Sequence, residues 1–455
     1  MPRMFGTNGV RGIVNDTLTP ELALKLGKAV GTWLKAGDRV CIGTDARESR
    51  DMLKGAFCAG LHATGVHTTD VGILASPGIQ IYGRDHKFAA GAIITASHNP
   101  PIWNGIKLTA PDGTETSPAQ EEEIEAHFFD ESFRIVPWDQ VGTHETTDAA
   151  KQHYIDAVLA QVDVEAIRAA NLKIVLDPGG GSGCVATPDF LRAVGVDFVP
   201  LSCELDGAFT DRPSEPTEAN SQACIAAVRE HGADFGFLMD GDADRSVFID
   251  ENGGYIWGDT SLALAAKHEL PRHANPVFCT AVSSGSCVKD AVESVGGELH
   301  WTVVGSPKVA QEMLRLGAVF GGEDNGGMMF ARHQLSRDGL MALGFMLETV
   351  ATTGRTLSDL CSDIPKYCLV KEKVQVPEEQ KPVLLDAFKA KLRDEDGILE
   401  VDDRDGVKCY VTEGWVLVRP SGTEPIFRVQ GEAKTQEAAT ALVARFKAIL
   451  ESTLS

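Results

Sequence analysis

The chain contains 455 residues, of which 43% are hydrophobic and 24% are charged, and its 65 Asp and Glu residues outnumber 42 Lys and Arg residues, giving a formal net charge of -23 at pH 7. This length exceeds what one hydrophobic core usually supports, so we expect two to four domains. The acidic balance argues against nucleic acid or an anionic membrane surface as a partner.

Hydropathy and cysteine usage indicate the compartment. No apolar run is long enough to span a bilayer, and the first residues lack the apolar core of a signal peptide. Ten cysteines occur without any Cys-x-x-Cys spacing, which favours reduced core thiols over disulfides or a zinc site. We therefore expect a cytoplasmic protein.

The first unusual stretch is residues 5–12, in which three glycines surround Arg11. Glycines let the backbone approach a ligand closely, and a guanidinium offers five donors in one plane. A ligand contact and a plain N-terminal strand with a Gly-rich turn are equally good interpretations of this octet.

One pattern of alternating strands and helices then occurs three times. Each copy closes with a third apolar strand, and we expect these closing strands at residues 88–94, 235–239 and 318–320. Alternating strands and helices favour mainly parallel sheets, so the repeat predicts three similar α/β domains. The loops that follow the three closing strands could then converge on one cleft.

The loop of the first copy spans residues 97–107 and contains Ser97, His98 and Lys107. The preceding strand brings Ser97 to its carboxyl end, where doubly wound α/β proteins bind their ligands. Ser97 is a candidate nucleophile, and His98 and Lys107 are candidate proton carriers. A lone Ser-His pair is more often a helix cap followed by a loop proline, so the other loops decide between the two interpretations.

The loop of the second copy carries three aspartates at alternating positions, Asp240, Asp242 and Asp244. In an extended or looped backbone this spacing directs three carboxylates to one side, as a magnesium site with room for a phosphate oxygen requires. A calcium-binding EF-hand would also place acids at Asp240 and Glu251. However, Arg245 stands where that loop needs glycine, and residues 246–249 favour a strand. Carboxylates so close together would repel one another without a cation.

The loop of the third copy, residues 322–327, offers Glu323 and Asn325 among glycines. These side chains could bind vicinal sugar hydroxyls, although Asn-Gly is also a common turn signal. Another loop nearby contains Gly305 and Lys308, and Lys308 could add a cation.

The pattern changes after about residue 368. A helix at 377–392, short strands at 398–401, 407–411 and 415–418, and a helix at 436–450 predict an α+β domain. Its loop contains guanidinium groups, hydroxyls and a glycine that suit one phosphate: Arg419, Ser421, Gly422, Thr423 and Arg428. The nucleotide P-loop order is absent, and a plain turn is the alternative.

Together these motifs resemble the α-D-phosphohexomutases, and within them the archaeal-like phosphoglucosamine mutase branch. The resemblance covers essentially the whole chain in the right order. It implies three similar α/β domains with mainly parallel mixed sheets, plus a C-terminal α+β domain, around a central cleft. The implied domains are residues 1–150 with the phosphoserine loop, 151–252 with the metal loop, 253–368 with the sugar loop and 369–455 with the phosphate-binding loop.

The resemblance also implies a mechanism. Ser97 would carry a phosphoryl group whose oxygen joins Asp240, Asp242 and Asp244 on Mg²⁺. The charge would be neutralised by Arg11 and Arg245, and protons would be moved by His98 and Lys107. The substrate would be a small phosphosugar held through Gly305, Lys308, Glu323, Asn325 and the C-terminal loop, and a hexose 1,6-bisphosphate would be the intermediate or activator. We expect a monomer or homodimer.

One loop departs from the family pattern. Most bacterial members have Gly-Glu-x-Ser-Gly-His in the sugar loop, whereas this chain has Asn325 and Gly327 in place of Ser and His. We expect a phosphoglucosamine mutase that interconverts glucosamine 6-phosphate and glucosamine 1-phosphate. A phosphomannomutase/phosphoglucomutase, a phosphosugar-binding protein without turnover and a simple phosphatase are the alternatives.

Overall fold

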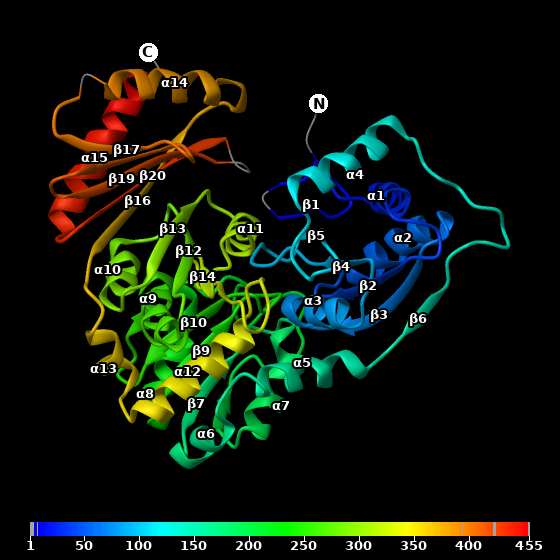
Figure 1. Cartoon of the computed structure of the whole chain (residues 1–455), viewed down its shortest axis with the longest axis horizontal. Coiled ribbons are helices and arrows are strands. Elements are labelled where there is room, and N and C mark those ends of the chain that lie inside the picture. The colour runs from blue at the N-terminus through cyan, green and yellow to red at the C-terminus, as the bar shows by residue number, and fades with distance from the viewer. Residues whose placement is uncertain (1–3, 7, 394, 422–424, 454–455) are drawn as a thin grey trace.

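The computed structural model describes residues 4–6, 8–393, 395–421 and 425–453. Figure 1 shows four sheets, each with its own helices, and the N-terminal and C-terminal sheets lie on opposite sides of the upper half of the molecule. No helix within the described ranges combines the length and the apolar character needed to cross a membrane.

The N-terminal domain contains a six-stranded sheet in the order β1-β5-β4-β2-β3-β6. Helices α1, α2 and α4 pack together and share one core cluster with this sheet, whereas α3 belongs to the core shared with the next domain. The elements are β1 Val10–Ile13, α1 Pro20–Trp33, β2 Arg39–Thr44, α2 Arg50–Ala63, β3 His67–Ile73, α3 Ser76–Asp85, β4 Ala90–Ile94, β5 Trp103–Thr109, α4 Pro118–Asp130 and β6 His144–Thr146.

The second domain contains a five-stranded sheet in the order β11-β10-β9-β7-β8. Its elements are α5 Ala149–Leu159, α6 Val164–Ala170, β7 Lys173–Asp177, α7 Gly183–Ala193, β8 Asp197–Pro200, η1 Ala219–Ser221, α8 Gln222–His231, β9 Phe235–Met239, β10 Ser246–Asp250 and β11 Tyr255–Ile256.

The third domain contains a four-stranded sheet in the order β13-β12-β14-β15. Its elements are α9 Gly258–Glu269, η2 Leu270–Arg272, β12 Val277–Ala281, α10 Ser286–Ser294, β13 Glu298–Thr302, α11 Ser306–Leu316, β14 Phe320–Gly322, β15 Met328–Phe330, α12 Gly339–Thr353 and α13 Leu357–Ser362.

The three sheets share one arrangement, which confirms the predicted repeat. In each, the second, first and third strands of the repeat are parallel neighbours, and an antiparallel strand pairs with the third: β3-β2-β4-β5, β8-β7-β9-β10 and β13-β12-β14-β15. A tight connection therefore follows the third strand in every copy. The loops with Ser97, Asp240 and Glu323 occupy these three equivalent positions.

Helix α12 joins the second and third domains. Its residues from Gly339 to Val350 are buried, and it packs on α5, α6 and β10 of the second domain and on α9 and β15 of the third. The largest core cluster accordingly runs through both domains and reaches α3 of the N-terminal domain. The three α/β domains thus share apolar contacts that fix their loops relative to one another.

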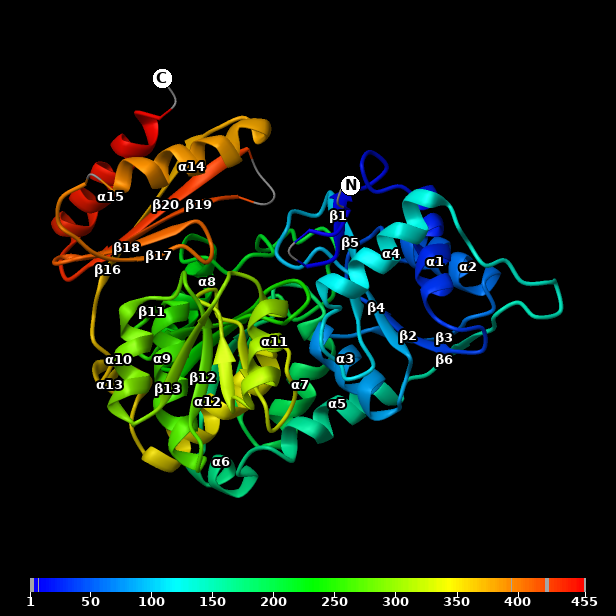
Figure 2. The ribbon, with the colours of Figure 1, turned by 45° about the horizontal axis from the view of Figure 1, so that its top comes forward.

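The C-terminal domain is an antiparallel sheet in the order β16-β20-β19-β18-β17, with two helices α14 and α15 against it. In Figure 2 the end of the sheet where β19 and β20 meet is directed toward the N-terminal domain. The elements are β16 Cys368–Gln375, η3 Glu378–Gln380, α14 Lys381–Leu392, β17 Ile398–Asp402, β18 Val407–Val411, β19 Gly414–Pro420, β20 Ile426–Ala433 and α15 Gln436–Glu451.

Three sequence expectations are corrected by these bounds. Residues 104–107 lie in β5 and not in a loop, and the closing strand of the third copy is Phe320–Gly322, two residues later than expected, because glycines weaken the strand signal there. Strands β16 and β20 were not expected at all. β16 contains three consecutive charged residues and only one buried position, and β20 has Arg428 and Glu432 among its mostly buried residues, so neither strand gives a clear alternating pattern.

Candidate active site

Ser97 lies in the connection between β4 and β5, and its side chain is completely buried. Its φ of 52° is in the left-handed region, which costs a non-glycine residue roughly 1–2 kcal/mol. Its N–H donates to the Thr95 hydroxyl at 2.9 Å, so the turn is held from within. The Ser97 hydroxyl in turn donates to Oδ2 of Asp240 at 2.7 Å, which places the candidate nucleophile against the loop of the second domain.

Arg47 holds the Ser97 loop in place, a role that sequence reasoning missed. Its guanidinium is fully buried, and Nε lies 3.0 Å from Oδ2 of the equally buried Asp45. The remaining donors bind four backbone carbonyls of the loop at 2.6–2.9 Å, those of Ser97, Asn99, Pro100 and Trp103. The only sequence signal was an Asp-x-Arg triplet after an apolar strand, which does not show that the arginine reaches a loop 50 residues away.

The three aspartates occupy the β9–β10 connection, as predicted. All three side chains are buried, and one carboxylate oxygen from each lies within 4.8 Å of the others. Within the described residues, Oδ1 of Asp242 and Oδ1 of Asp244 are buried without a hydrogen-bond partner. Orphaned oxygens of this kind and an all-oxygen donor set fit a divalent cation such as Mg²⁺. Burial and the two neighbouring carboxylates raise the pKa of Asp240 to about 7. The strand β10 also rules out an EF-hand.

Lys107 projects from β5 toward this cluster. Its ammonium lies 2.6 Å from Oδ2 of Asp242 and 3.2 Å from Oδ2 of Asp244. Burial opposes ionisation of Asp242, but the contact with Lys107 outweighs it and lowers the pKa of that carboxyl. Lys107 and the hydroxyl of Ser76 therefore hold one oxygen of Asp242, and the other oxygen stays available to a cation.

His98 lies beside Ser97, and two arginines bind residues of the Ser97 loop. Nδ1 of His98 lies 3.5 Å from the Ser97 hydroxyl and accepts a hydrogen bond from Arg245 at 2.9 Å. Burial and the neighbouring guanidinium groups lower the pKa of His98 to about 2, so the imidazole is neutral. Arg11 donates to Oδ1 of Asn99 at 2.9 Å, and Nε of both Arg11 and Arg245 is buried without a hydrogen-bond partner in the described chain. Unpaired cationic donors suit an anionic group on Ser97.

In the third loop, Glu323 makes hydrogen bonds within the protein. Both of its carboxylate oxygens are already engaged: Oε1 accepts from the Gly305 N–H at 3.1 Å and Oε2 from Arg337 at 3.0 Å. Oδ1 of Asn325 accepts from the Gly327 N–H at 3.1 Å. Lys308 is half-buried in the first turn of α11.

Arg337 was missed by sequence reasoning. It precedes α12, 14 residues after Glu323 and 93 residues after Asp244, and its guanidinium binds both Glu323 and Oδ2 of Asp244, the latter at 2.6 Å. Burial opposes its charge, but the two carboxylates prevail and raise the pKa of Arg337. The local sequence, an arginine before the Asp-Gly pair that begins a helix, does not predict which carboxylates the arginine contacts.

The predicted phosphate-binding loop lies at the end of the β19–β20 hairpin. Arg419 and Arg428 are directly opposite each other across the two strands, and Nε of Arg419 lies 2.9 Å from Oδ2 of Asp405. Ser421 is buried, and its carbonyl accepts a 2.5 Å hydrogen bond from Lys381, a further cation that the sequence did not reveal. Gly422 and Thr423 lie outside the described residues.

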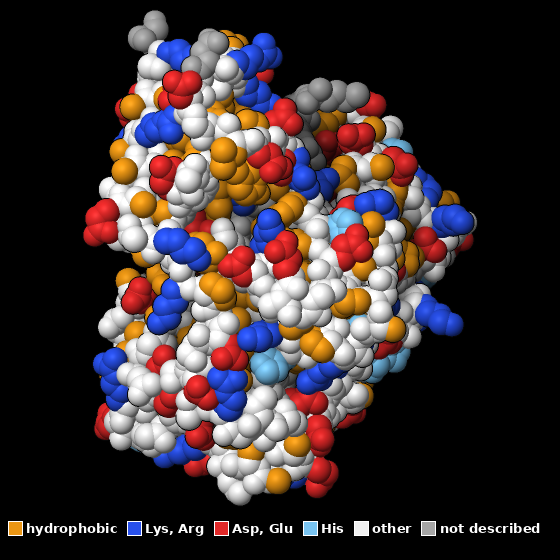
Figure 3. Space-filling view, turned by 60° about the vertical axis from the view of Figure 1, so that its left-hand side comes forward, with side chains coloured by type: hydrophobic (Ala, Val, Ile, Leu, Met, Phe, Trp, Pro, Cys, Tyr) orange, Lys and Arg blue, Asp and Glu red, His pale blue; other side chains and the backbone are white. Residues whose placement is uncertain are grey.

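The three α/β loops converge on one another, and the C-terminal hairpin faces them across a hollow. Asp405 also accepts from the Val304 N–H at 2.9 Å, so the Arg419 strand is tied to the residue before Gly305. Figure 3 shows the hollow between the C-terminal domain and the N-terminal domain, with Lys and Arg side chains beside it. The Lys and Arg side chains at this hollow suit an anionic ligand, and Asp and Glu side chains lie beside it as well.

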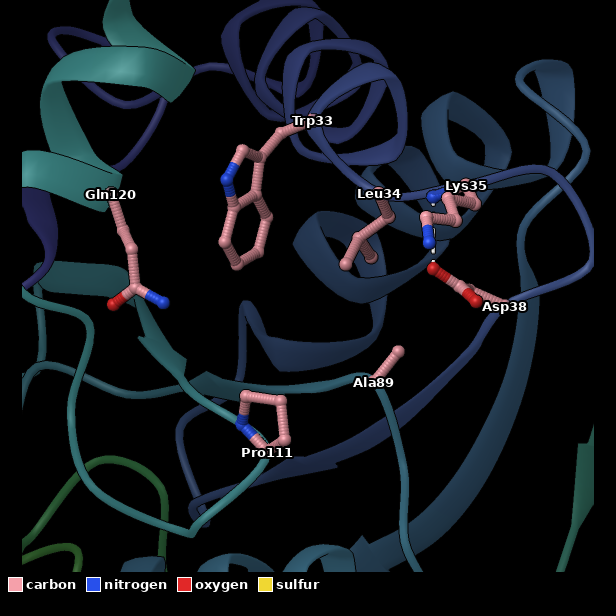
Figure 4. Close-up of a pocket in the computed structure, with 7 residues that line it drawn as sticks. All are labelled: Trp33, Leu34, Lys35, Asp38, Ala89, Pro111 and Gln120. Carbon is pink, nitrogen blue, oxygen red and sulfur yellow. Dashed lines mark hydrogen bonds between the residues drawn. The ribbon is translucent and has the colours of Figure 1, made fainter.

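A separate pocket of about 340 Å³ lies within the N-terminal domain. Figure 4 shows that its lining is mostly apolar, with Trp33 facing Gln120, and that its one drawn hydrogen bond joins Asp38 to the backbone of Lys35. None of the predicted site residues lines this pocket, so it is separate from the Ser97 cluster.

Comparison with known proteins agrees with this geometry. A relative from Thermococcus kodakarensis, phosphoglucomutase/phosphomannomutase, is 41% identical and covers 96% of both chains. A relative from Sulfurisphaera tokodaii, phosphoglucosamine/phosphogalactosamine mutase, is 38% identical over 99% of this chain and 100% of its own. A crystal structure of a phosphoglucomutase/phosphomannomutase family protein from Burkholderia thailandensis superposes with a TM-score of 0.88 at 26% identity, covering 99% of this chain and 97% of that one.

Four family descriptions match consecutive parts of the chain. The phosphoglucomutase/phosphomannomutase alpha/beta/alpha domains I, II and III match residues 2–135, 152–254 and 257–367, and the C-terminal domain of the same family matches residues 372–449. The chain is therefore a phosphohexomutase-family enzyme, an isomerase of the phosphoglucomutase/phosphomannomutase family within the α-D-phosphohexomutase superfamily.

Proposed function

We propose that this enzyme interconverts glucosamine 6-phosphate and glucosamine 1-phosphate through a phosphorylated Ser97. The observation that carries the proposal is the 2.7 Å contact between the Ser97 hydroxyl and Asp240. His98 lies 3.5 Å from the same hydroxyl, and Arg245 and Arg11 bind His98 and Asn99 of the same loop. A nucleophile, a cation-binding carboxylate set and cationic groups are the parts that phosphoryl transfer requires. A binding protein would need no nucleophile.

Asp240, Asp242 and Asp244 would hold Mg²⁺, which when bound would neutralise charge on the transferring phosphoryl group. Arg11 and Arg245 would bind oxygens of that group through their buried donors. Lys107 would keep Asp242 and Asp244 oriented through the oxygens that face away from the cation.

The first transfer breaks the bond between phosphorus and the Ser97 oxygen and forms a bond between phosphorus and the sugar 1-hydroxyl oxygen. The proton leaves that sugar hydroxyl and ends on the Ser97 oxygen; we propose that the neutral imidazole of His98, 3.5 Å from that oxygen, passes it across, while the Lys107 ammonium stays charged beside the two aspartates. The product is a hexose 1,6-bisphosphate. After this intermediate turns around, its 6-phosphoryl group returns to Ser97, which releases glucosamine 1-phosphate and restores the phosphorylated enzyme.

The phosphate that is not reacting would bind the C-terminal hairpin at Arg419, Ser421, Gly422, Thr423 and Arg428. The opposed positions of Arg419 and Arg428 across β19 and β20 support this assignment, because one phosphate can accept from two facing guanidinium groups. The sugar ring would then lie near Gly305, Lys308, Glu323 and Asn325.

A second candidate is a phosphomannomutase/phosphoglucomutase of the same mechanism, which the name of the 41% identical relative favours. The deciding experiment measures product formation and kcat/KM with the 6-phosphates of glucosamine, galactosamine, glucose and mannose. The highest kcat/KM on glucosamine 6-phosphate would support the proposal. A preference for glucose or mannose phosphate would establish the second candidate, and release of inorganic phosphate alone would indicate a phosphatase.

A further inference from the structure

Arg337 connects two loops to which the proposed mechanism assigns different tasks. One nitrogen of its guanidinium binds Oδ2 of Asp244 in the metal loop at 2.6 Å, and another binds Oε2 of Glu323 in the sugar loop at 3.0 Å. The side chain is 6% exposed, so these ion pairs are shielded from water. A planar fork can satisfy both carboxylates at once, which a single ammonium cannot do with the same geometry.

The backbone around Arg337 is fixed to the same two loops. The next residue, Asp338, caps α12 and donates its own N–H to the Met328 carbonyl just after the sugar loop, at 3.0 Å. Gly339 donates to the Ala243 carbonyl in the metal loop at 3.2 Å, and a β-carbon at Gly339 would lie 2.8 Å from that oxygen. Hydrogen bonds to both loops therefore fix the backbone next to Arg337, which carries the guanidinium.

Gly327 provides the space that the Arg337 side chain occupies. A β-carbon built at Gly327 would lie 2.1 Å from Cδ of Arg337, so any side chain at position 327 would have to displace the arginine. Position 327 is where the bacterial family pattern has histidine. The absence of a side chain at Gly327 thus leaves the space that the Arg337 side chain fills.

The arginine engages one oxygen of each carboxylate in a definite way. At Asp244 it holds Oδ2, while Oδ1 is buried without a hydrogen-bond partner among the described residues and fits a cation ligand. At Glu323 it holds Oε2, and the Gly305 N–H holds Oε1, so the carboxylate cannot rotate. Groups that orient a metal ligand in this way typically change metal affinity 10- to 100-fold when they are mutated.

We propose that Arg337 is a positioning residue that orients Asp244 for the cation and Glu323 for the sugar, in the space that Gly327 leaves. This inference rests on the proposed function of the two loops. It predicts that one substitution, at Arg337, changes both metal binding and sugar binding. If the two loops were organised independently, one substitution would change only one of them.

The first test replaces Arg337 with lysine, which keeps the positive charge and removes the fork. Mn²⁺ binding, followed by the electron paramagnetic resonance signal of the free ion, should weaken by about 10-fold or more. KM for glucosamine 6-phosphate should rise by a similar factor, with a smaller fall in kcat. Arg332→Lys is the matched control, because Arg332 lies five residues earlier and bridges Glu269 and Gln161 away from both loops. It should leave Mn²⁺ affinity and KM unchanged.

A second variant keeps the proposal testable if Arg337→Lys fails to fold. Gly327→Ala pushes against Cδ of Arg337 and should reproduce both effects while the arginine remains. The loss of Mn²⁺ affinity and the rise in KM of the double variant should each be smaller than the sum of the two single-variant effects, expressed as free energies. The reason is that the lysine can move aside for the new methyl group. Strict additivity, or single variants that keep both constants within twofold of wild type, would overturn the inference.

The outcomes also separate this inference from the proposed function. A wild type that converts none of the four sugar phosphates overturns the proposed function, and the Mn²⁺ titrations then decide the metal half of the inference alone. A wild type with full mutase activity and unaffected variants overturns only the assignment of Arg337.

Discussion

The Ser97 hydroxyl and the Asp240 carboxylate are in direct contact at 2.7 Å although 143 residues separate them in the chain. The contact joins equivalent connections of two repeated domains and brings the proposed nucleophile to the edge of the proposed cation site. It exists because β4 and β9 end at the same cleft, with α3 of the N-terminal domain packed into the core of the second. The reactivity of Ser97 is therefore expected to depend on residues of both domains.

Ser97→Ala should reduce steady turnover by at least about 10³-fold, because it removes the oxygen proposed to carry the phosphoryl group. Binding of sugar phosphate should persist, since the C-terminal hairpin is intact. Intact-protein mass spectrometry should detect one phosphoryl group on wild type and none on the variant. Ser221→Ala, at another buried serine whose hydroxyl binds the Thr217 carbonyl, is the control and should keep its activity. Undiminished turnover by Ser97→Ala would exclude the covalent mechanism.

Removal of divalent cations should stop catalysis, and added Mg²⁺ should restore it. The buried Oδ1 atoms of Asp242 and Asp244 would otherwise lack any partner within the described structure. Asp242→Asn should raise the Mg²⁺ concentration needed for half-maximal rescue by about 10-fold or more, because it removes a charged ligand and the counter-charge of Lys107. Rates measured against Mg²⁺ concentration test this, and full activity in thoroughly metal-free enzyme would contradict it.

Arg47→Met should destabilise the N-terminal domain by roughly 3–5 kcal/mol, because it leaves Asp45 buried and uncompensated and frees four loop carbonyls. Denaturant unfolding followed by fluorescence measures the loss. Arg39→Met is the control in the same domain, since its partner Glu145 is exposed and such a pair contributes less than about 1 kcal/mol. Equal effects from the two variants would show that Arg47 does not organise the Ser97 loop.

Arg419→Ala should raise KM for the sugar phosphate at least about 10-fold and change the first transfer rate much less, because Arg419 is proposed to hold the phosphate that is not reacting. Single-turnover kinetics separate the two quantities. Arg445→Ala, which removes an arginine paired with Glu395 and Asp396 in the same domain, should leave KM unchanged. An unchanged KM with a lower kcat would place Arg419 at the reacting end of the substrate.

Cys41 and Cys58 should resist alkylation in the native protein. Burial raises the pKa of Cys41 to about 12 and that of Cys58 to about 11, so about one such thiol in a thousand or fewer is ionised at pH 8. Peptide mapping after iodoacetamide treatment at pH 8 should find these two residues unmodified, and denaturation should expose all ten cysteines. Rapid native labelling of Cys41 would show that the core of the N-terminal domain opens readily.

The sequence was informative wherever function depended on neighbours along the chain. Asp240, Asp242 and Asp244 are close in sequence and follow an apolar strand, so their shared site could be predicted from spacing alone. Ser97 could be placed at a strand end for the same reason. Arg47 and Arg337 could not be found, because Ser97 lies 50 residues from Arg47 and Asp244 lies 93 residues from Arg337, and an isolated arginine does not indicate which carbonyl or carboxylate it will reach.

In the sugar loop, the sequence predicted the position of a residue but not its contacts. Glu323 was correctly placed at the end of a closing strand, but the sequence could not show that both of its oxygens are occupied within the protein. In the C-terminal domain, the alternation of buried Phe427 and Val429 with Arg428 marks a strand. We interpreted the arginine as part of a phosphate-binding loop, and the competing strand signal was missed.

The repeated hairpins have a consequence for how the enzyme acquires its activity during refolding. Each hairpin closes a short loop, so the β4–β5, β9–β10 and β14–β15 turns need only local contacts to form. The contacts that assemble the site are long-range: Ser97 with Asp240, Lys107 with Asp242, and Arg337 with Asp244. Such contacts require the domains to have packed first. Secondary structure should therefore return before catalytic competence, and the lag between the two reports the docking of domains that are already folded.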